Sequence, residues 1–189
     1  NKKNMELGYS KNKEITKSKG VFLAFWDPDD FWKKDKLKKQ IAFMKKNSVK
    51  ISHTSYKIIN KNDKIIGERK AKKLLNHKTL LNDCEIGLST VIINKKFFSN
   101  KIKFPNLKTK EDFVLWLKLT KYSKIYGLKT FLCFWRNTDD SLSKNTIQKI
   151  LDGFRVYKIY MNFSFFKSIY YLFILSTNYI RKIIWFITL

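Results

Sequence analysis

Short apolar runs alternate with lysine-rich stretches along this chain of 189 residues. Val21 to Trp26 are six consecutive apolar residues bounded by Gly20 and Pro28, a pattern typical of a strand buried on both faces. Pro28 cannot donate to a sheet ladder, so we expect the strand to end there. The carboxyl end of such a strand is where open α/β sheets bind ligands.

Strands and helices are expected to alternate over the rest of the chain. Leu37, Ile41 and Met44 recur at helical spacing with lysines opposite them, which predicts an amphipathic helix packed on the sheet. The other expected elements are a helix in residues 1–19, a hairpin over 49–59 and 65–67, a helix over 74–81, a strand over 86–93, a helix from 109, a strand over 125–134 and a helix over 147–160.

An acidic cluster follows the first apolar strand. Asp27, Asp29 and Asp30 would repel one another unless a cation joined them, and hard oxygen ligands suit Mg²⁺ or Mn²⁺. Alternatively, these side chains cap a turn and the next helix. A second candidate is Asp112, three residues after Thr109 at the start of an apolar helix. That spacing is close to a capping box, so a purely structural role is the alternative there too.

The charge of the chain points to anionic surfaces rather than to sequence-specific nucleic acid. The net charge is +25, yet only four of 40 basic residues are arginine. A nucleic-acid reader would use more arginine for bidentate contacts, so we expect no specific nucleic acid partner. Genomic base composition is an alternative source of the lysines. Either way, such a surface should adhere to anionic lipid headgroups and polyanions.

The C-terminal stretch 163–189 is aromatic and aliphatic but is interrupted by Arg181 and Lys182. No uninterrupted run reaches the ~20 residues of a transmembrane helix. We therefore expect residues 146–189 to form a helical, membrane-associated tail with basic anchors. Packing against a partner domain is the competing explanation.

Other residues exclude some classes of protein. Cys84 and Cys133 have neither metal-ligand spacing nor the density of a disulfide scaffold, which favours a reducing cytosol. His53 and His77 are isolated, so we expect no zinc site. No signal peptide is visible, and a start at Asn1 suggests a piece of a longer protein.

The segment from Gly20 to Trp32, with Lys36, Leu37 and Gln40, resembles family-2 glycosyltransferases of the GT-A fold. The resemblance implies an α/β, Rossmann-like mixed sheet with flanking helices, lacking the N-terminal βαβ portion. It covers residues 8–145 and implies a partial domain, 1–145, followed by the C-terminal amphipathic helices. The family delivers an Asp-x-Asp-Asp to the phosphates of a nucleotide-sugar through a divalent cation. This implies Asp29 and Asp27 as ligands of Mn²⁺ or Mg²⁺, with Asp30 beside the diphosphate.

The same resemblance assigns the other candidate residues. The stretch from Asp112 to Trp116 resembles the general-base motif, which implies Asp112 as the base and leaves Glu111 a weaker candidate. Lys11 falls on the family's arginine, and Arg136 with 141–143 resembles its closing loop, so both would face the diphosphate. A solvated lysine and a surface arginine are the alternatives. Three residues of the matched motifs are expected beside the acceptor sugar: Ser89, Thr90 and Trp116. Ordinary β-propensity explains Thr90 equally well.

By resemblance, the reaction is inverting transfer of a sugar from a nucleotide-sugar, a UDP-sugar most of all, to a hydroxyl of a glycan or lipid-linked glycan. The expected setting is synthesis of surface polysaccharide at the cytoplasmic, inner face of a bacterial membrane. As a truncated piece, the isolated chain is expected to be inactive. The rival is a non-catalytic basic module that binds membranes or polyanions. That rival explains the charge and the tail, but not the carboxylates at strand ends.

Overall fold

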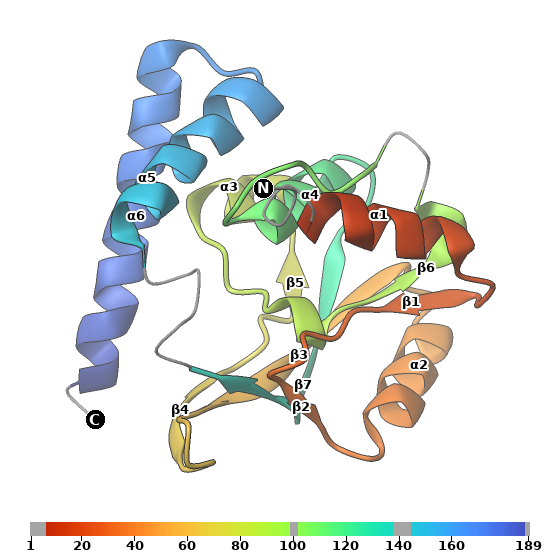
Figure 1. The fold of residues 1–189 in the computed structure, drawn as a ribbon. Coiled ribbons are helices and arrows are strands. Elements are labelled where there is room, and N and C mark those ends of the chain that lie inside the picture. Colours follow the sequence, from red (N-terminus) through yellow and green to blue (C-terminus); the bar gives the residue numbers. More distant parts are fainter. Residues whose placement is uncertain (1–6, 99–101, 138–144, 188–189) are drawn as a thin grey trace.

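A computed structural model of the chain describes residues 7–98, 102–137 and 145–187. A mixed sheet lies at its centre with helices on both faces (Figure 1). Its strands are β1 (Phe22–Ala24), β2 (Phe31–Trp32), β3 (Ile51–Ile59), β4 (Ile65–Arg69), β5 (Leu74–Leu75), β6 (Ile92–Asn94) and β7 (Ile125–Arg136). Their order is β1-β6-β3-β7-β2, with β4 beside β3 and β5 beside β7. Only the β3–β7 pair is parallel among those described.

The helices confirm the predicted α/β class. They are α1 (Leu7–Lys17), α2 (Lys36–Lys46), α3 (His77–Asn82), α4 (Glu111–Thr120), α5 (Thr146–Arg155) and α6 (Phe165–Ile187), with 3₁₀ turns η1 (Leu88–Thr90) and η2 (Lys95–Phe97) and a π-helical turn η4 (Val156–Tyr160). The helix expected over 74–81 is shorter than predicted, because Leu74 and Leu75 pair with β7. Within the strand expected over 86–93, residues 88–90 form a 3₁₀ turn and only Ile92 and Ile93 belong to a strand.

Adjacent residues of the sheet pack against opposite layers, as the pleat requires. Ile93 belongs to the main core with α4, while Ile92 packs against Met44 of α2 on the other face. Helix α4 is buried along most of its length, from Phe113 to Leu117. The sheet is therefore held between α4 on one face and α2 on the other (Figure 1).

The expectation of a doubly buried strand at Val21 to Trp26 is wrong. Strand β1 has only three residues, and Trp26 is 61% exposed. The physical reason is its position: within the described chain β1 pairs only with β6 and forms an edge of the sheet. One edge of β1 therefore has no neighbouring strand in the described chain, whereas the all-apolar sequence suggested a strand in the interior of the sheet.

The predicted buried face of α2 is confirmed at Met44, with Ile41 packed beside it, but is wrong at Leu37. Leu37 is 42% exposed, whereas Lys36, Gln40 and Met44 face the sheet. The Lys36 ammonium lies 4.2 Å from the centre of the Trp32 ring and donates to Oε1 of Gln40 at 2.9 Å. Burial lowers the pKa of Lys36 to about 8. Because its amide also donates to Thr90 O, Gln40 ties α2 to η1.

Strand β7 approaches the β4–β5 connection closely at Gly127. A Cβ at that position would lie 2.1 Å from the Lys72 carbonyl oxygen and 3.1 Å from Nε2 of His53. Nε2 of His53 in turn lies 3.3 Å from the same carbonyl. Burial lowers the pKa of His53 to about 4, so the ring is a neutral, packed side chain as its isolation in the sequence suggested.

Helices α5 and α6 lie side by side at one flank of the domain (Figure 1). They confirm that residues 147–160 and the stretch after 163 are mainly helical. Gly153 of α5 lies against Leu172 of α6, and Tyr157 reaches the core and donates to Leu81 O at 2.7 Å. In the described ranges, none of the helices combines the length and apolar character needed to cross a membrane.

Candidate functional site

The acidic cluster forms a tight turn between β1 and β2. The amide of Asp30 donates to Asp27 O at 3.0 Å, and the Trp26 indole donates to Asp30 O at 2.9 Å. The turn leaves Asp29 exposed and Asp30 buried. The three predicted carboxylates therefore differ in their environment, and Asp29 is the one that faces solvent.

Ser89 of η1 holds this turn in place through two hydrogen bonds. Its Oγ accepts from the Asp27 amide at 2.9 Å, and its carbonyl accepts from the Trp32 indole at 2.8 Å. Burial raises the pKa of Asp30 to about 6, against hydrogen bonds from the Ser89 hydroxyl and the Arg136 amide. The position of the acidic turn thus depends on Ser89, a role that the sequence did not indicate.

Arg136, at the end of β7, lies against the other side of the turn. Its amide donates to Asp30 Oδ1 at 3.1 Å and its Nε to Asp29 O at 3.2 Å. One terminal nitrogen donates to Asp63 Oδ1 at 2.6 Å, and the guanidinium stacks 4.8 Å from the centre of Phe31. The structure therefore places Arg136 beside the predicted turn, but the guanidinium nitrogens already donate to oxygen atoms of the protein. Residues 141–143 of the predicted closing loop lie outside the described residues.

Two further charges meet beside the turn, Lys11 of α1 and Glu111 of α4. Nζ of Lys11 lies 2.9 Å from Oε1 of Glu111, and both side chains are largely buried. Burial raises the pKa of Asp27, while Lys11 lowers it and Glu111 raises it. Lys11, Asp27 and Glu111, far apart in the sequence, are thus electrostatic neighbours.

Asp112 completes this group. Burial raises its pKa to about 7, with the Glu111 charge adding to the shift, Lys11 opposing it and Asp27 making a smaller contribution. Its Oδ1 accepts from the Phe113 amide at 2.7 Å. A carboxyl with a pKa near neutrality can exchange a proton at working pH, which is the requirement for a general base.

The capping box that was the structural alternative at Thr109 is not formed in the described structure. The amide and hydroxyl of Thr109 both donate to Oδ2 of Asp152, each at 3.0 Å. Helix α4 begins at Glu111 after Lys110, whose φ of 62° is left-handed and which makes no side-chain cap. The Thr109 hydroxyl is therefore used to hold α5, and it leaves Asp112 free of that pairing.

The three residues expected beside the acceptor are covered by the rest of the protein. The Thr90 hydroxyl donates to Gly87 O at 2.6 Å, and Ser89 is bonded to the acidic turn. Trp116 is 0% exposed and packs edge-on against Phe25, and within the described chain its Nε1 has no hydrogen-bond partner. The structure thus places these residues beneath the turn rather than on its open side.

The acidic turn could hold a hard cation such as Mg²⁺ only together with a bound ligand that supplies further oxygen atoms. Among the residues that the structure describes, no group of three or more His, Cys, Asp or Glu side chains could hold a metal. Asp27 and Asp29 supply carboxylate oxygens, whereas Asp30 is turned toward Ser89 and Arg136. Mg²⁺ is usually held by one or two carboxylates together with substrate phosphates, so this donor set fits a cation shared with a diphosphate.

Two features of the site were missed by sequence reasoning. The pairing of Lys11 with Glu111 has no local signal, because it joins elements separated by most of the chain. The burial of Lys36 with Gln40 did leave a signal, since the two are spaced by four residues on one helix face.

Comparison with known proteins gives consistent matches. Residues 1–104 match the model of glycosyl transferase family 2. Over 184 residues the chain is 30% identical to a Bacillus subtilis protein named as a teichuronic acid biosynthesis glycosyltransferase, TuaG, covering 95% of this chain and 71% of TuaG. Over 143 residues it is 34% identical to WfgD of Escherichia coli, a UDP-Glc:alpha-D-GlcNAc-diphosphoundecaprenol beta-1,3-glucosyltransferase, covering 75% of this chain and 55% of WfgD.

The fold resembles that of a solved structure of another protein. Residues 1–349 of S. aureus TarS, in complex with UDP-GlcNAc, superpose with a TM-score of 0.61 at 17% identity, over 87% of this chain and 50% of that chain. The chain therefore spans only about half to two-thirds of the length of most of these relatives.

Proposed function

Because this chain belongs to glycosyl transferase family 2, we propose that its protein transfers a sugar from a nucleotide-diphosphate sugar to an acceptor hydroxyl with inversion. One observation carries this proposal: Asp27 of the acidic turn and Asp112 of α4 interact electrostatically across the site and share Lys11. The rival, a non-catalytic basic module, gives no reason for carboxylates to converge at the end of a strand.

In this proposal Asp112 is the general base. It would take the proton of the acceptor hydroxyl as that oxygen attacks the anomeric carbon, while the bond to the diphosphate breaks on the opposite side. A single base on the attacking side is what an inverting displacement needs. The pKa of Asp112 near 7 supports the role, because a base works best when its pKa lies near the operating pH.

Asp29, with Asp27, would hold a divalent cation, Mn²⁺ or Mg²⁺, which when bound would neutralise charge on the departing diphosphate. Asp30 acts differently, because its carboxylate already accepts from the Arg136 amide and so fixes the turn. Lys11 balances Asp27 and Glu111, and it would face the diphosphate as a point charge. We assign Arg136, at the end of β7, to positioning the acidic turn between β1 and β2.

Ser89, Thr90 and Trp116 are proposed to act on the acceptor indirectly. They form the floor beneath the turn, through the Ser89 bond to Asp27 and the packing of Trp116 on Phe25. Movement of this floor would shift the carboxylates relative to the acceptor. Their substitution should therefore change turnover more than acceptor affinity.

The proposed donor is a UDP-sugar and the proposed acceptor a glycan or lipid-linked glycan, in the synthesis of surface polysaccharide at the inner face of the membrane. The names of the relatives support this choice: WfgD uses UDP-Glc and a diphosphoundecaprenol-linked sugar, and TuaG is named for teichuronic acid biosynthesis. Neither name fixes the sugar or linkage made by this protein.

The decisive experiment is Asp29→Asn in protein that carries the whole family domain. We expect loss of divalent-cation dependence together with most of the sugar transfer, because Asp29 is the carboxylate that faces solvent at the turn. Transfer is measured with and without Mn²⁺ and with chelator. Asp35→Asn is the matched control, since Asp35 is a nearby, partly exposed carboxylate that forms an ion pair with Lys39. Transfer by Asp29→Asn that persists in excess chelator would refute the assignment.

A further inference from the structure

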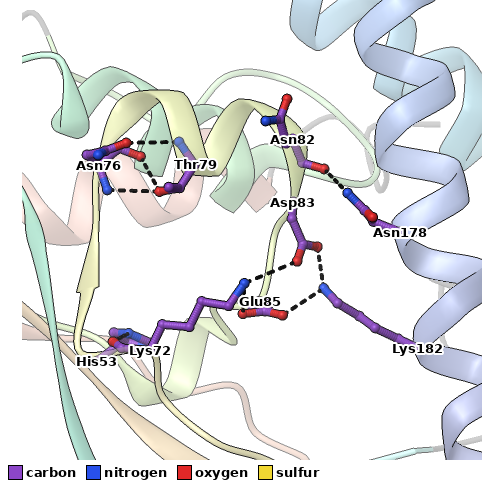
Figure 2. Close-up of polar contacts among 9 residues, drawn as sticks. All are labelled: His53, Lys72, Asn76, Thr79, Asn82, Asp83, Glu85, Asn178 and Lys182. Carbon is purple, nitrogen blue, oxygen red and sulfur yellow. Dashed lines mark hydrogen bonds and ion pairs between the residues drawn. The ribbon is translucent and has the colours of Figure 1, made fainter.

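Helix α6 has one face that is fixed to the protein. Ser168, Leu175 and Lys182 are spaced by seven residues; the first two are buried, and Lys182 forms ion pairs with Asp83 and Glu85. Asn178 on the same side donates to Asn82 O at 3.0 Å (Figure 2). These contacts fix the rotation of α6 about its own axis, and so decide which residues point outward.

The opposite face of α6 is apolar and exposed. Phe166, Phe173 and Ile180 are also spaced by seven residues, and Phe166 and Phe173 are 82% and 68% exposed. Ile169 and Tyr170 fill the intervening turn and are exposed as well. A contiguous exposed apolar stripe of this kind marks an interaction surface rather than an ordinary soluble face.

Helix α5 extends this stripe. Ile147, Ile150 and Leu151 are exposed along one side of α5. The Phe154 ring meets the exposed Phe165 ring edge-on at a centroid distance of 5.7 Å, which joins the two helices at their apolar sides. We call the exposed apolar residues of the two helices the α5–α6 apolar face; they are Ile147, Ile150, Leu151, Phe165, Phe166, Ile169, Tyr170, Phe173, Tyr179 and Ile180.

The charges around this face have one sign. No aspartate or glutamate follows Asp152 in the chain, and Asp152 itself is buried against Thr109. The exposed charged side chains of this stretch are all cations: Arg155, Lys158, Lys167 and Arg181. An isologous contact between two copies would bring these like charges together with no carboxylate on α6 to offset them.

We propose that the α5–α6 apolar face lies in the interfacial region of an anionic lipid bilayer, with α6 parallel to the surface. Apolar side chains would enter the headgroup boundary, and the flanking cations would face anionic headgroups. The proposal concerns the membrane setting of the proposed function but rests only on α5 and α6, so lipid binding and sugar transfer are tested separately.

Deleting α6 is not a clean test, because Leu175 and Lys182 belong to the fold. The test is the double variant Phe166→Ser/Phe173→Ser, which changes two side chains that contribute little to the core. Tyr9→Ser is the matched control, since Tyr9 is an exposed aromatic on α1, away from α6 in Figure 1. Circular dichroism and thermal melts should be the same for all three proteins.

Flotation with vesicles is the measurement, because aggregates sink while bound protein rises. The chain and Tyr9→Ser should float with phosphatidylglycerol-containing vesicles and much less with pure phosphatidylcholine. The double variant should need about 10²-fold more lipid for half-binding, as expected for losing two large apolar side chains. High salt should weaken the binding of the chain only in part, because apolar burial is not screened.

Two results would overturn the proposal. Equal flotation of the chain and the double variant would assign lipid binding to nonspecific charge. Light scattering that detects concentration-dependent dimers of the chain, abolished in the double variant and without any vesicle binding, would instead make this face a self-association surface.

Discussion

Two acidic clusters of this protein differ in how their charge is balanced. Asp83 and Glu85, after α3, are joined by two lysines from distant elements: Lys72 lies 2.9 Å from Glu85, and Lys182 of α6 contacts both carboxylates (Figure 2). In the candidate site, the three carboxylates Asp27, Glu111 and Asp112 have two lysines beside them among the described residues, Lys11 and, next to Asp112, Lys110. One cluster has a cation for each carboxylate and the other does not.

The pKa of Glu85 follows this difference, although burial raises the pKa of the neighbouring Asp83 in spite of Lys182. Burial raises the pKa of Glu85, but the hydrogen bond from Lys72 and the charge of Lys182 outweigh it and leave the pKa lowered. Burial also raises the pKa of Asp112, and there the nearby Glu111 adds to the rise, which reaches about 7. The balanced cluster fastens α6 to the domain, whereas the unbalanced cluster holds carboxylates ready for a cation or a proton. An excess of carboxylates over neighbouring cations thus distinguishes the candidate site from the other cluster.

The largest expected effect is on catalysis. Asp112→Asn should lower turnover ~10²–10⁴-fold through loss of the base, while donor binding stays intact because the amide oxygen can still accept from Phe113. Asp83→Asn, in the balanced cluster, should leave turnover nearly unchanged. Steady-state kinetics and donor titration of protein with the whole family domain measure both. Similar losses of turnover in the two variants would remove the distinction between the clusters.

The next effect is on stability. Lys182→Met should lower the free energy of unfolding by ~1–3 kcal/mol at pH 7, because Asp83 and Glu85 lose a half-buried partner. Lys78→Met, an exposed lysine of the same region, is the control. Urea denaturation at several pH values is the measurement. Since the folded pKa of Glu85 is lowered, its stabilisation is present above its unfolded pKa and is lost as pH falls, so the deficit should shrink in acid.

The smallest expected effect is an increase in stability. The pKa of Asp112 is raised on folding, so its ionisation destabilises the folded state as pH rises from about 4 through about 7. Asp112→Asn removes this cost and should gain ~1 kcal/mol, or ~2–4 °C in Tm, at pH 8. The gain should vanish near pH 4, where the wild-type carboxyl is protonated. Thermal melts at the two pH values test it, and a destabilised variant at pH 8 would mean that Asp112 serves the fold instead.

The sequence predicted the element order well because apolar periodicity reports which segments are buried. It placed the hairpin, the helix that carries Asp112 and the last strand. It failed where a polar group takes an apolar position. Lys36 replaces Leu37 on the buried side of α2, because an indole and an amide satisfy its ammonium.

Pairings between distant segments were the other failure. The Thr109 hydroxyl was assigned to its own helix, but Asp152 from α5 competes for it and wins two hydrogen bonds. Likewise, the compensation of Glu111 by Lys11 depends on how α1 is placed against α4. The spacing of residues in the sequence shows which polar and charged groups are available. Which of these groups lack a partner of opposite charge or a hydrogen bond is decided by the tertiary structure.

The close approach at Gly127 limits which sequences this fold can accept. A methyl group there would displace the Lys72 carbonyl and disturb the neighbouring His53. Because the side chain of Lys72 joins the cluster that fastens Lys182, a shift of this backbone would be transmitted to α6. A substitution at Gly127 is therefore expected to affect the attachment of α6. The effects of substitutions at Lys72 and Lys182 on stability are expected to be non-additive.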